Sequence, residues 1–246
     1  MKLLVCISQA PDTTSRIAFT NDNREFDSNG VQYIVNPYDE WFALVRAIEL
    51  KEQQGDTVTT ITVGGAQCDP TIRKSLAIGA DDAVRIDSEP TDAMQVARLI
   101  AGYANGKGFD VILCGKETID YNGSQVGGMI AAILDQPFIS NASKMEMDGN
   151  KATVQRDIQG GKEVIEVETP FVLSAAKGMA EARIPNMRGI MAARTKPLNV
   201  IEPAEAENAT EIVSYELPPA KGDCKYIDAD NAAELLELLR NEAKVI

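Results

Sequence analysis

Short β-branched runs alternate with longer stretches of helical periodicity up to about Ile201, and this alternation constrains the fold more than any other feature. It is typical of a parallel sheet whose faces are covered by helices. The pattern predicts strands at 2–7, 58–63, 83–86, 110–114 and 171–175. Apolar residues recurring at helical spacing predict helices at 39–54, 69–78 and 92–103, and a further helix ending near Leu134. We therefore predict an α/β fold with an open parallel sheet.

The rhythm of the chain changes after Lys144, where polar and apolar residues alternate as far as Val167. Two turn signals, Asp148-Gly149-Asn150 and Gln159-Gly160-Gly161, interrupt this stretch. Alternation around such turns is typical of antiparallel hairpins. We expect hairpins that extend the sheet beyond its parallel part.

The last part of the chain has a different character from the sheet-forming part. Residues 202–219 are acidic and contain three prolines, and residues 229–243 show one more amphipathic helix. This pattern predicts a tail that packs on something outside the sheet-forming part. We therefore divide the chain into an α/β domain at 1–201 and a C-terminal arm at 202–246.

Composition removes several classes of function. The net charge of −13 makes nucleic acid an unlikely partner, and the absence of histidine removes imidazole bases, Ser-His-Asp catalysis and His-ligated zinc. The four cysteines are far apart, without the spacing of a metal site or a disulfide framework. The apolar run at the N-terminus is too short for a signal peptide, and no stretch has the length of a membrane span. We expect a cytoplasmic bacterial protein without membrane insertion.

Three junctions between a strand and the next helix have residues suited to a phosphate or an adenine ring: Cys6-Ile7-Ser8, Val63-Gly64-Gly65-Ala66, and the run from Gly115 to Gly128. In an open α/β sheet the carboxyl ends of neighbouring strands line one crevice. In the third junction Ser124 is the expected N-cap of the following helix, whose N-terminus would hold a phosphate. Neither the GxGxxG nor the P-loop pattern is present. Taken alone, each glycine cluster is better explained as a tight turn than as a phosphate site.

Other residues are weaker candidates for a catalytic or metal-binding role. Asp39, Glu40 and Asp120 have no second catalytic group at a suitable spacing, so we expect helix capping or solvation. Cys6 and Cys114 lie in predicted strands, where a buried thiol behaves as a small apolar group. We predict no catalytic side chain.

Charge is divided unevenly near the end of the domain. Residues 177–196 hold five basic side chains and one acidic side chain, whereas residues 202–246 hold four basic and eleven acidic ones. The pattern at 177–196 predicts an exposed loop that runs into a short helix. A solvated loop and a docking surface both remain open from the charge alone.

Four parts of the chain stand out together: Asn36 to Glu40, Gly64 to Cys68 with Thr71 to Asp81, the loop from Gly115 to Gly127, and Gly189 to Ala192. In their order and spacing they closely resemble the electron transfer flavoprotein beta subunit, and the resemblance runs from one end of the chain nearly to the other. The resemblance implies a Rossmann-like sheet of the adenine nucleotide alpha hydrolase type. It also implies a heterodimer with a larger alpha subunit, which holds most of the FAD and around which the C-terminal arm would wrap.

The resemblance assigns a second site to this chain itself. In the family the crevice of the beta subunit holds AMP, or a second FAD in the electron-bifurcating members. By motif position, Cys6, Asn36 and Val63 would line adenine and ribose. The phosphate would be held by Gly115 and by the loop residues Asp120, Tyr121, Asn122, Gly123, Ser124, Gln125 and Val126.

Two departures from the family pattern bear on the nucleotide. Ser8 stands where many members have lysine, and Tyr121 to Ser124 differs from the Gly-Asp-Thr-Ala run of bifurcating members. Both departures favour AMP, and a second FAD is the alternative. A universal-stress-type ATP-binding module is a third interpretation, although such modules lack the segments after Lys144.

The resemblance also implies a recognition loop that docks on partner dehydrogenases through a protruding leucine. Met187 falls at the place of this leucine, and Arg183 and Arg188 are expected to pair with carboxylates of the partner. Ile190 and Met191 complete the expected docking residues. The implied function is electron transfer from flavin dehydrogenases, expected to be acyl-CoA dehydrogenases, to a quinone oxidoreductase.

Overall fold

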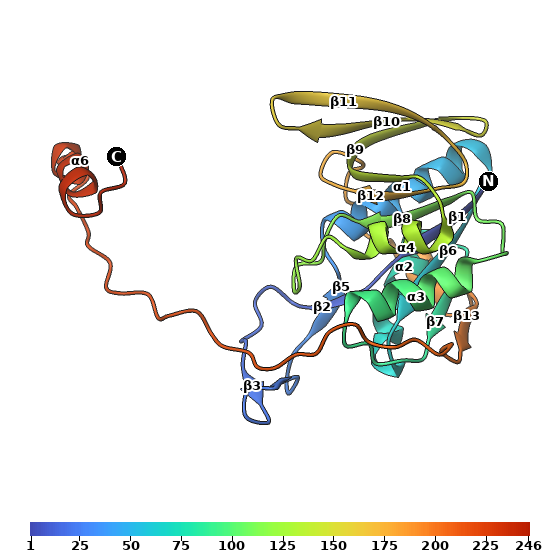
Figure 1. Ribbon diagram of the computed structural model, residues 1–246, viewed down its shortest axis with the longest axis horizontal. Coiled ribbons are helices and arrows are strands. Elements are labelled where there is room, and N and C mark those ends of the chain that lie inside the picture. Colours follow the sequence, from blue (N-terminus) through green and yellow to red (C-terminus); the bar gives the residue numbers. More distant parts are fainter.

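The computed structural model describes all residues from Met1 to Ile246 and confirms the α/β class. Its main sheet has nine strands in the order β11-β10-β9-β12-β8-β1-β6-β7-β13 (Figure 1). The strands from β9 to β13 in this order are parallel to their neighbours. The predicted parallel strands are β1 (Lys2–Cys6), β6 (Thr57–Val63), β7 (Asp82–Ile86), β8 (Val111–Gly115) and β12 (Phe171–Ala175).

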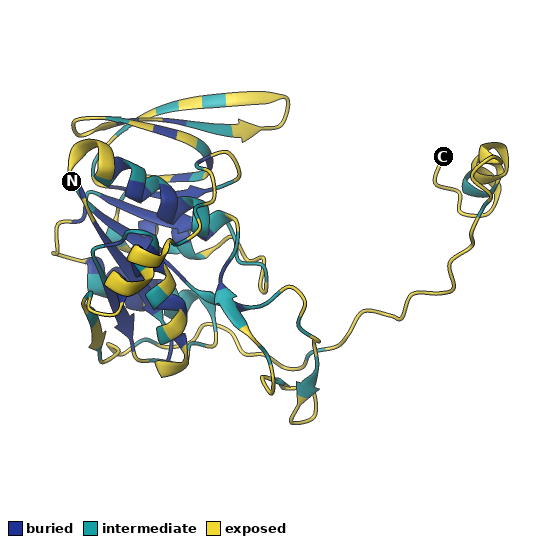
Figure 2. Cartoon of the chain, turned by 180° about the vertical axis from the view of Figure 1, so that it is seen from behind, coloured by how far each residue is buried: buried dark blue, intermediate teal, exposed yellow.

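Helices cover both faces of the sheet and enclose two apolar cores. Helices α1 (Asp39–Gln54) and α2 (Asp69–Ile78) pack on one face, where Leu44, Ile48 and Leu76 are buried. Helices α3 (Ala93–Ala104) and α4 (Val126–Leu134) pack on the other face with Ile100 and Ile130. Figure 2 shows the strands between these layers as the most buried part of the chain. The predicted helices are confirmed, because each buries the apolar stripe from which it was predicted.

The predicted antiparallel extension is present and larger than expected. Strand β9 begins at Phe138 and not at Lys144, and it ends at Asp148. Its first half lies parallel to β12, and its second half pairs antiparallel with β10 (Lys151–Ile158), which pairs with β11 (Gly161–Glu168). Strand β9 thus joins the parallel sheet to the hairpin.

Several short elements were not predicted. Strand β13 (Leu198–Ile201) adds an edge next to β7, and two small sheets pair β2 (Gln9–Pro11) with β5 (Tyr33–Val35) and β3 (Phe19–Thr20) with β4 (Glu25–Phe26). A 3₁₀ turn, η1 (Ala66–Cys68), precedes α2. Two or three paired residues are too few to show a period in the sequence.

The C-terminal arm leaves the body as an extended chain and ends in α6 (Ala232–Asn241), which stands away from it (Figure 1). Several contacts attach the first part of the arm, including hydrogen bonds from Gln95 and Arg98 to its backbone carbonyls. Asp92 accepts hydrogen bonds from the amides of Ala209 and Thr210, and Tyr215 stacks on Phe19 with ring centroids 4.9 Å apart. Helix α6 has no buried residue. None of the helices has the length and apolar character needed to cross a membrane.

Candidate functional site

The chain reverses its direction of travel across the sheet between β1 and β8. From β1 it proceeds through β6 to β7 on one side, and it then returns to the other side of β1 with β8 and β12. In open α/β sheets the crevice at such a reversal, outside the carboxyl ends of the two strands, is the usual ligand site. The residues after Cys6 and after Cys114 therefore occupy the expected position.

A hydrogen-bonded cluster lies at this junction. The amide and the hydroxyl of Ser8 donate to the two carboxylate oxygens of Glu40, at 2.7 and 2.8 Å. The side-chain amide of Asn36 donates to the Ser8 hydroxyl at 3.2 Å, and its oxygen accepts from the backbone N–H of Ile119 at 3.1 Å. The cluster connects the end of β1, the start of α1 and the loop after β8.

Gly115 at the end of β8 lets the first turn of α1 approach the sheet. A Cβ atom there would lie 2.7 Å from both Cγ and the backbone nitrogen of Glu40. Such a contact is too short for any side chain, so the glycine is required for the packing of α1. Its role as a direct phosphate contact stays a prediction.

The loop after Gly115 is mostly exposed and turns back on itself before α4. Asn122 and Ser124 adopt left-handed backbone conformations with φ of 49° and 51°. The expectation that Ser124 caps α4 is wrong. The N-cap position belongs to Gln125, and the hydroxyl of Ser124 instead donates to Glu117 at 3.3 Å. No side chain caps the N-terminus of α4, so its first amides are available to another acceptor.

The charges around the crevice are mainly negative. Burial raises the pKa of Glu40 to about 8. The negative charges of Asp120 and Asp39 also raise this pKa, whereas the hydrogen bonds from Ser8 lower it. Burial also raises the pKa of Asp39. Lys116 is paired with Glu117 at 2.8 Å, which raises the pKa of the lysine. A buried carboxyl with a raised pKa is partly protonated near neutral pH, which reduces its repulsion of a bound anion.

The structure brings most of the predicted nucleotide residues to one edge of the sheet, at different depths. Asn36 is fully buried, and its amide is used in the cluster under the crevice. The thiol of Cys6 lies in the core, where its contact with Cys114 and its burial raise its pKa well above the ordinary value. Val63 ends the adjacent strand β6. Residues 120–125 are exposed and border the crevice from outside.

Sequence reasoning missed Glu40, which was expected to cap or to be solvated. It is 6% exposed. The signal was present, because Glu40 precedes Leu44 and Ile48 by four and eight residues and therefore lies on the buried stripe of α1. No group of three or more His, Cys, Asp or Glu side chains is arranged to hold a metal ion.

The predicted exposed loop at 177–196 is confirmed, and it contains the short helix α5 (Met187–Ala193). Several large apolar side chains on it face solvent. Ile184 is 92% exposed, Met187 73% and Met191 64%. Ile184 was not among the predicted docking residues, although it is the most exposed of the large apolar side chains. Exposed apolar residues clustered in this way are typical of contact surfaces.

The loop is attached to α1 before it reaches Ile184. The indole of Trp41 donates to the carbonyl of Arg183 at 3.2 Å, and the guanidinium of Arg183 forms two hydrogen bonds with Glu52, at 2.8 and 2.9 Å. Arg183 therefore already has a carboxylate partner within the chain. Arg188, also predicted to dock, forms no ion pair and is exposed.

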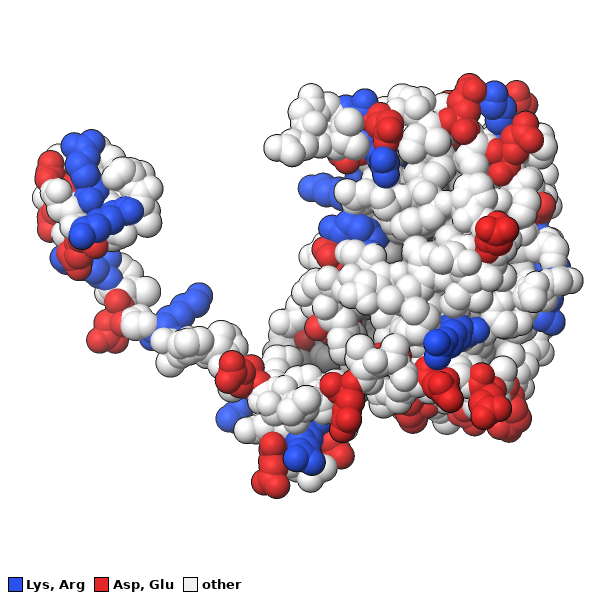
Figure 3. All heavy atoms as spheres, viewed as in Figure 1, with Lys and Arg blue, Asp and Glu red and all other residues white.

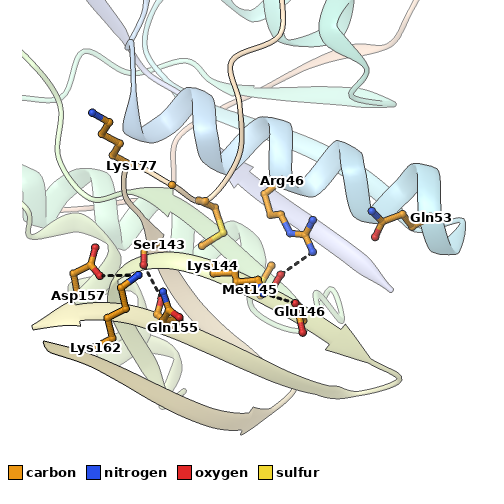
Figure 4. Close-up of a pocket in the computed structure, with 12 residues that line it drawn as sticks. Arg46, Gln53, Ser143, Lys144, Met145, Glu146, Gln155, Asp157, Lys162 and Lys177 are labelled. Atoms are coloured by element: carbon orange, nitrogen blue, oxygen red, sulfur yellow. Dashed lines mark hydrogen bonds and ion pairs between the residues drawn. The ribbon is translucent and has the colours of Figure 1, made fainter.

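A polar groove of about 650 Å³ lies at the root of this loop, between α1 and the hairpin of β9, β10 and β11 (Figure 4). Arg46 lines the groove, and its guanidinium donates a hydrogen bond to the carbonyl of Met145 at 2.7 Å. Lys177 at the start of the loop has no ion pair. Figure 3 shows basic side chains below the hairpin on the edge of the body nearest the arm, and side chains of both signs elsewhere on this face.

The fold and these sites together define a class: an α/β protein with a reversal of strand order in its parallel sheet, an exposed apolar loop and a C-terminal arm whose last helix buries no residue. Comparison with known proteins supports the same class. A family model described as "Electron transfer flavoprotein domain" matches residues 25–206.

Relatives extend the match to the full chain. A Bacillus subtilis protein named electron transfer flavoprotein subunit beta is 36% identical over 260 positions, which cover 100% of both chains. Proteins of the same name from Syntrophomonas wolfei and Homo sapiens are 36% and 32% identical, and they match 100% and 90% of this chain over 98% and 90% of their own lengths. The chain belongs to the electron transfer flavoprotein beta subunit family.

Proposed function

We propose that this chain pairs with an alpha subunit to form a heterodimeric electron carrier, which accepts electrons from flavin dehydrogenases and passes them towards a quinone oxidoreductase. The observation that carries the proposal is the family match over the whole chain, including both the crevice and the docking loop. Bound FAD, held mainly by the alpha subunit, supplies the redox chemistry. The chain itself binds, orients and docks, and none of its side chains is required to react.

The crevice between β1 and β8 suits AMP as a structural nucleotide. The first amides of α4 have no side-chain cap, and amides at a helix N-terminus favour a phosphate. Gly123 faces open space, which leaves room beside these amides. The raised pKa of Glu40, about 8, lets this carboxyl take up a proton when an anion lies nearby.

A second FAD in place of AMP is the alternative for the crevice. It would need a longer groove along the loop at 120–125, which is exposed and has no partner on its outer side. The serine at position 8 and the acidic surroundings formed by Asp39 and Glu40 bring no free positive charge towards a second pyrophosphate. These features favour the smaller nucleotide.

The docking loop gives the carrier its contact with dehydrogenases, for which acyl-CoA dehydrogenases are the proposed class. Ile184 and Met187 offer exposed apolar side chains to a pocket on the partner, and the thioether chain of Met187 is flexible. Arg188 lies beside them without a partner in the chain, so it can pair with a carboxylate at the rim of that pocket. Both apolar residues, and not Met187 alone, are the proposed anchors.

The test is to co-express the chain with the alpha subunit, purify the complex, denature it and quantify the released nucleotides. One FAD and one AMP per heterodimer are expected. Two FAD without AMP would contradict the assignment of AMP and favour an electron-bifurcating complex. If the chain does not bind the alpha subunit and instead binds ATP as a homodimer, the proposal of an electron carrier is contradicted and the universal-stress class is favoured.

A further inference from the structure

Two basic side chains link the C-terminal ends of helices α2 and α5, one from each segment to backbone carbonyls of the other. Arg73 of α2 donates from Nη1 to the carbonyls of Ala193 and Lys196, each at 2.7 Å. In return the ammonium of Lys196 donates to the carbonyls of Leu76, at 2.9 Å, and Ala80. The last carbonyls of a helix have no partner within the helix and carry partial negative charge, so each cation stabilises the end that it reaches.

Close backbone packing accompanies this exchange. A Cβ atom on Gly189 of α5 would lie 2.2 Å from the carbonyl oxygen of Ala77 near the end of α2. The N–H of Gly189 is bonded to the side chain of Asn186, which caps α5 at 2.8 Å. Ala193 at the end of α5 is buried, whereas most of the helix is exposed. Helix α5 therefore rests on α2 through its backbone and a few small residues.

A helix of seven residues is not stable by itself in water, so α5 depends on these contacts for its order. On its other side the loop is fixed at Arg183, which is bonded to Glu52 and Trp41 of α1. The segment between the two attachments, 184–188, contains the exposed Ile184 and Met187. The attachments hold the ends of this turn and leave its side chains free.

We propose that Arg73 and Gly189 are positioning residues for docking: they hold α5 on α2, so that the turn at 184–188 is ordered before a partner arrives. Ordering a loop in advance removes an entropic cost from the binding step and so increases affinity. The inference rests on the proposed docking function. It adds to that function two residues at the contact between α2 and α5, away from the partner.

The test uses the FAD-loaded heterodimer with a partner flavin dehydrogenase, and compares Arg73→Met and Gly189→Ala with Lys74→Met. Lys74 is the next residue on α2, is exposed and forms no hydrogen bond or ion pair, so its loss controls for charge. We expect KM for the dehydrogenase to rise about fivefold or more in the first two variants, with kcat within about twofold. Amide exchange at 187–193 should accelerate about tenfold in both, and Lys74→Met should change neither quantity.

The outcomes separate the inference from the proposed function. Faster amide exchange with an unchanged KM would overturn the positioning role and leave a structural one. Unchanged exchange would show that the contacts do not order α5, which also overturns it. If Ile184→Ala and Met187→Ala leave KM unchanged in the same assay, the loop does not dock, and the proposed docking function is refuted together with the inference that rests on it. Should Arg73→Met not fold, Gly189→Ala tests the same contact without removing a charge.

Discussion

Ser8 donates both its amide and its hydroxyl to Glu40, one to each carboxylate oxygen, and thereby joins the end of β1 to the first turn of α1. The pair lies directly under the crevice between β1 and β8. Glu40 is almost completely buried, and no lysine, arginine or N-terminus forms an ion pair with it. A buried carboxyl held only by neutral donors makes the stability of the domain depend on pH.

The first prediction concerns this pH dependence. The pKa of Glu40 is raised from 4.5 to about 8 in the folded chain, so its favourable contribution is complete below pH 4.5 and is lost as the pH rises through about 8. Glu40→Gln keeps the shape and cannot ionise. Unfolding measured from pH 5 to pH 9 should show the free energy of unfolding of the variant rising relative to that of the wild type, by up to about 1.4 kcal/mol per pH unit until the pH reaches about 8. Glu205→Gln on the exposed arm is the control, and a pH-independent difference would refute the assignment.

The second prediction concerns the close approach at the end of β8. Gly115→Ala places a Cβ atom 2.7 Å from two atoms of Glu40, one of them a backbone atom that cannot rotate away. We expect a loss of about 1–3 kcal/mol in the free energy of unfolding, measured by urea denaturation. Gly102→Ala on α3 meets nothing within 4 Å and should stabilise the helix slightly. Equal stability of the two variants would be inconsistent with this packing.

The third prediction tests where the nucleotide binds. Gly123 lies on the exposed loop with nothing within 4 Å, so Gly123→Trp should leave Tm unchanged. If AMP occupies the proposed site, the indole should obstruct it and the purified heterodimer should lose most of its AMP. Chromatography of the released nucleotides measures this, with Gly102→Trp as the matched open position. Full AMP retention would mean that the phosphate lies elsewhere.

The fourth prediction compares the two apolar anchors. Ile184→Ala and Met187→Ala remove side chains that are 92% and 73% exposed, so neither should change Tm. Each should slow flavin reduction by the partner dehydrogenase about tenfold or more, since truncated anchors at the centre of an interface have effects of this size. Val164→Ala removes an exposed apolar side chain from β11 and serves as the control. Stopped-flow absorbance of the flavin gives the rates, and normal rates in both variants would place docking elsewhere.

The fifth prediction concerns the arm. A chain that ends after Pro219 keeps Tyr215 on Phe19 but lacks α6, none of whose residues is buried in the isolated chain. We expect the melting of the α/β domain to stay the same, while recovery of the heterodimer on co-purification falls severalfold. An unchanged yield of heterodimer would remove the arm from the interface with the alpha subunit.

Regular periodicity decided which elements could be predicted. The helix at 39–54 was predicted to the residue, because its apolar stripe runs from Trp41 to Leu50 and Gly55 ends it in a left-handed conformation. Strand β13 was not predicted, because it is four residues long, none of them is fully buried, and it forms by pairing with β7. Pairing of this kind is a tertiary effect that local sequence does not encode.

The sequence predicted where the candidate site lies in the fold, but it did not predict which side chains contact one another there. The sequence placed the crevice at the ends of β1 and β8, since parallel strands present their carboxyl ends together. It did not show that Asn36 is fully buried, or that Arg183 is paired with Glu52 across 131 residues. Such pairings depend on which surfaces fold together, and the residue types alone leave several partners available.

The outer strand β11 leaves one edge of the main sheet uncovered, and this edge could pair with a strand of another molecule. Its free edge carries Lys162, Glu166 and Glu168 on the exposed side, and a turn at Gly160 bounds it. An uncovered edge strand offers unpaired backbone groups to any other strand, and charged side chains along it oppose such pairing. The same residues therefore protect the chain from edge-to-edge aggregation during the interval between its synthesis and its assembly.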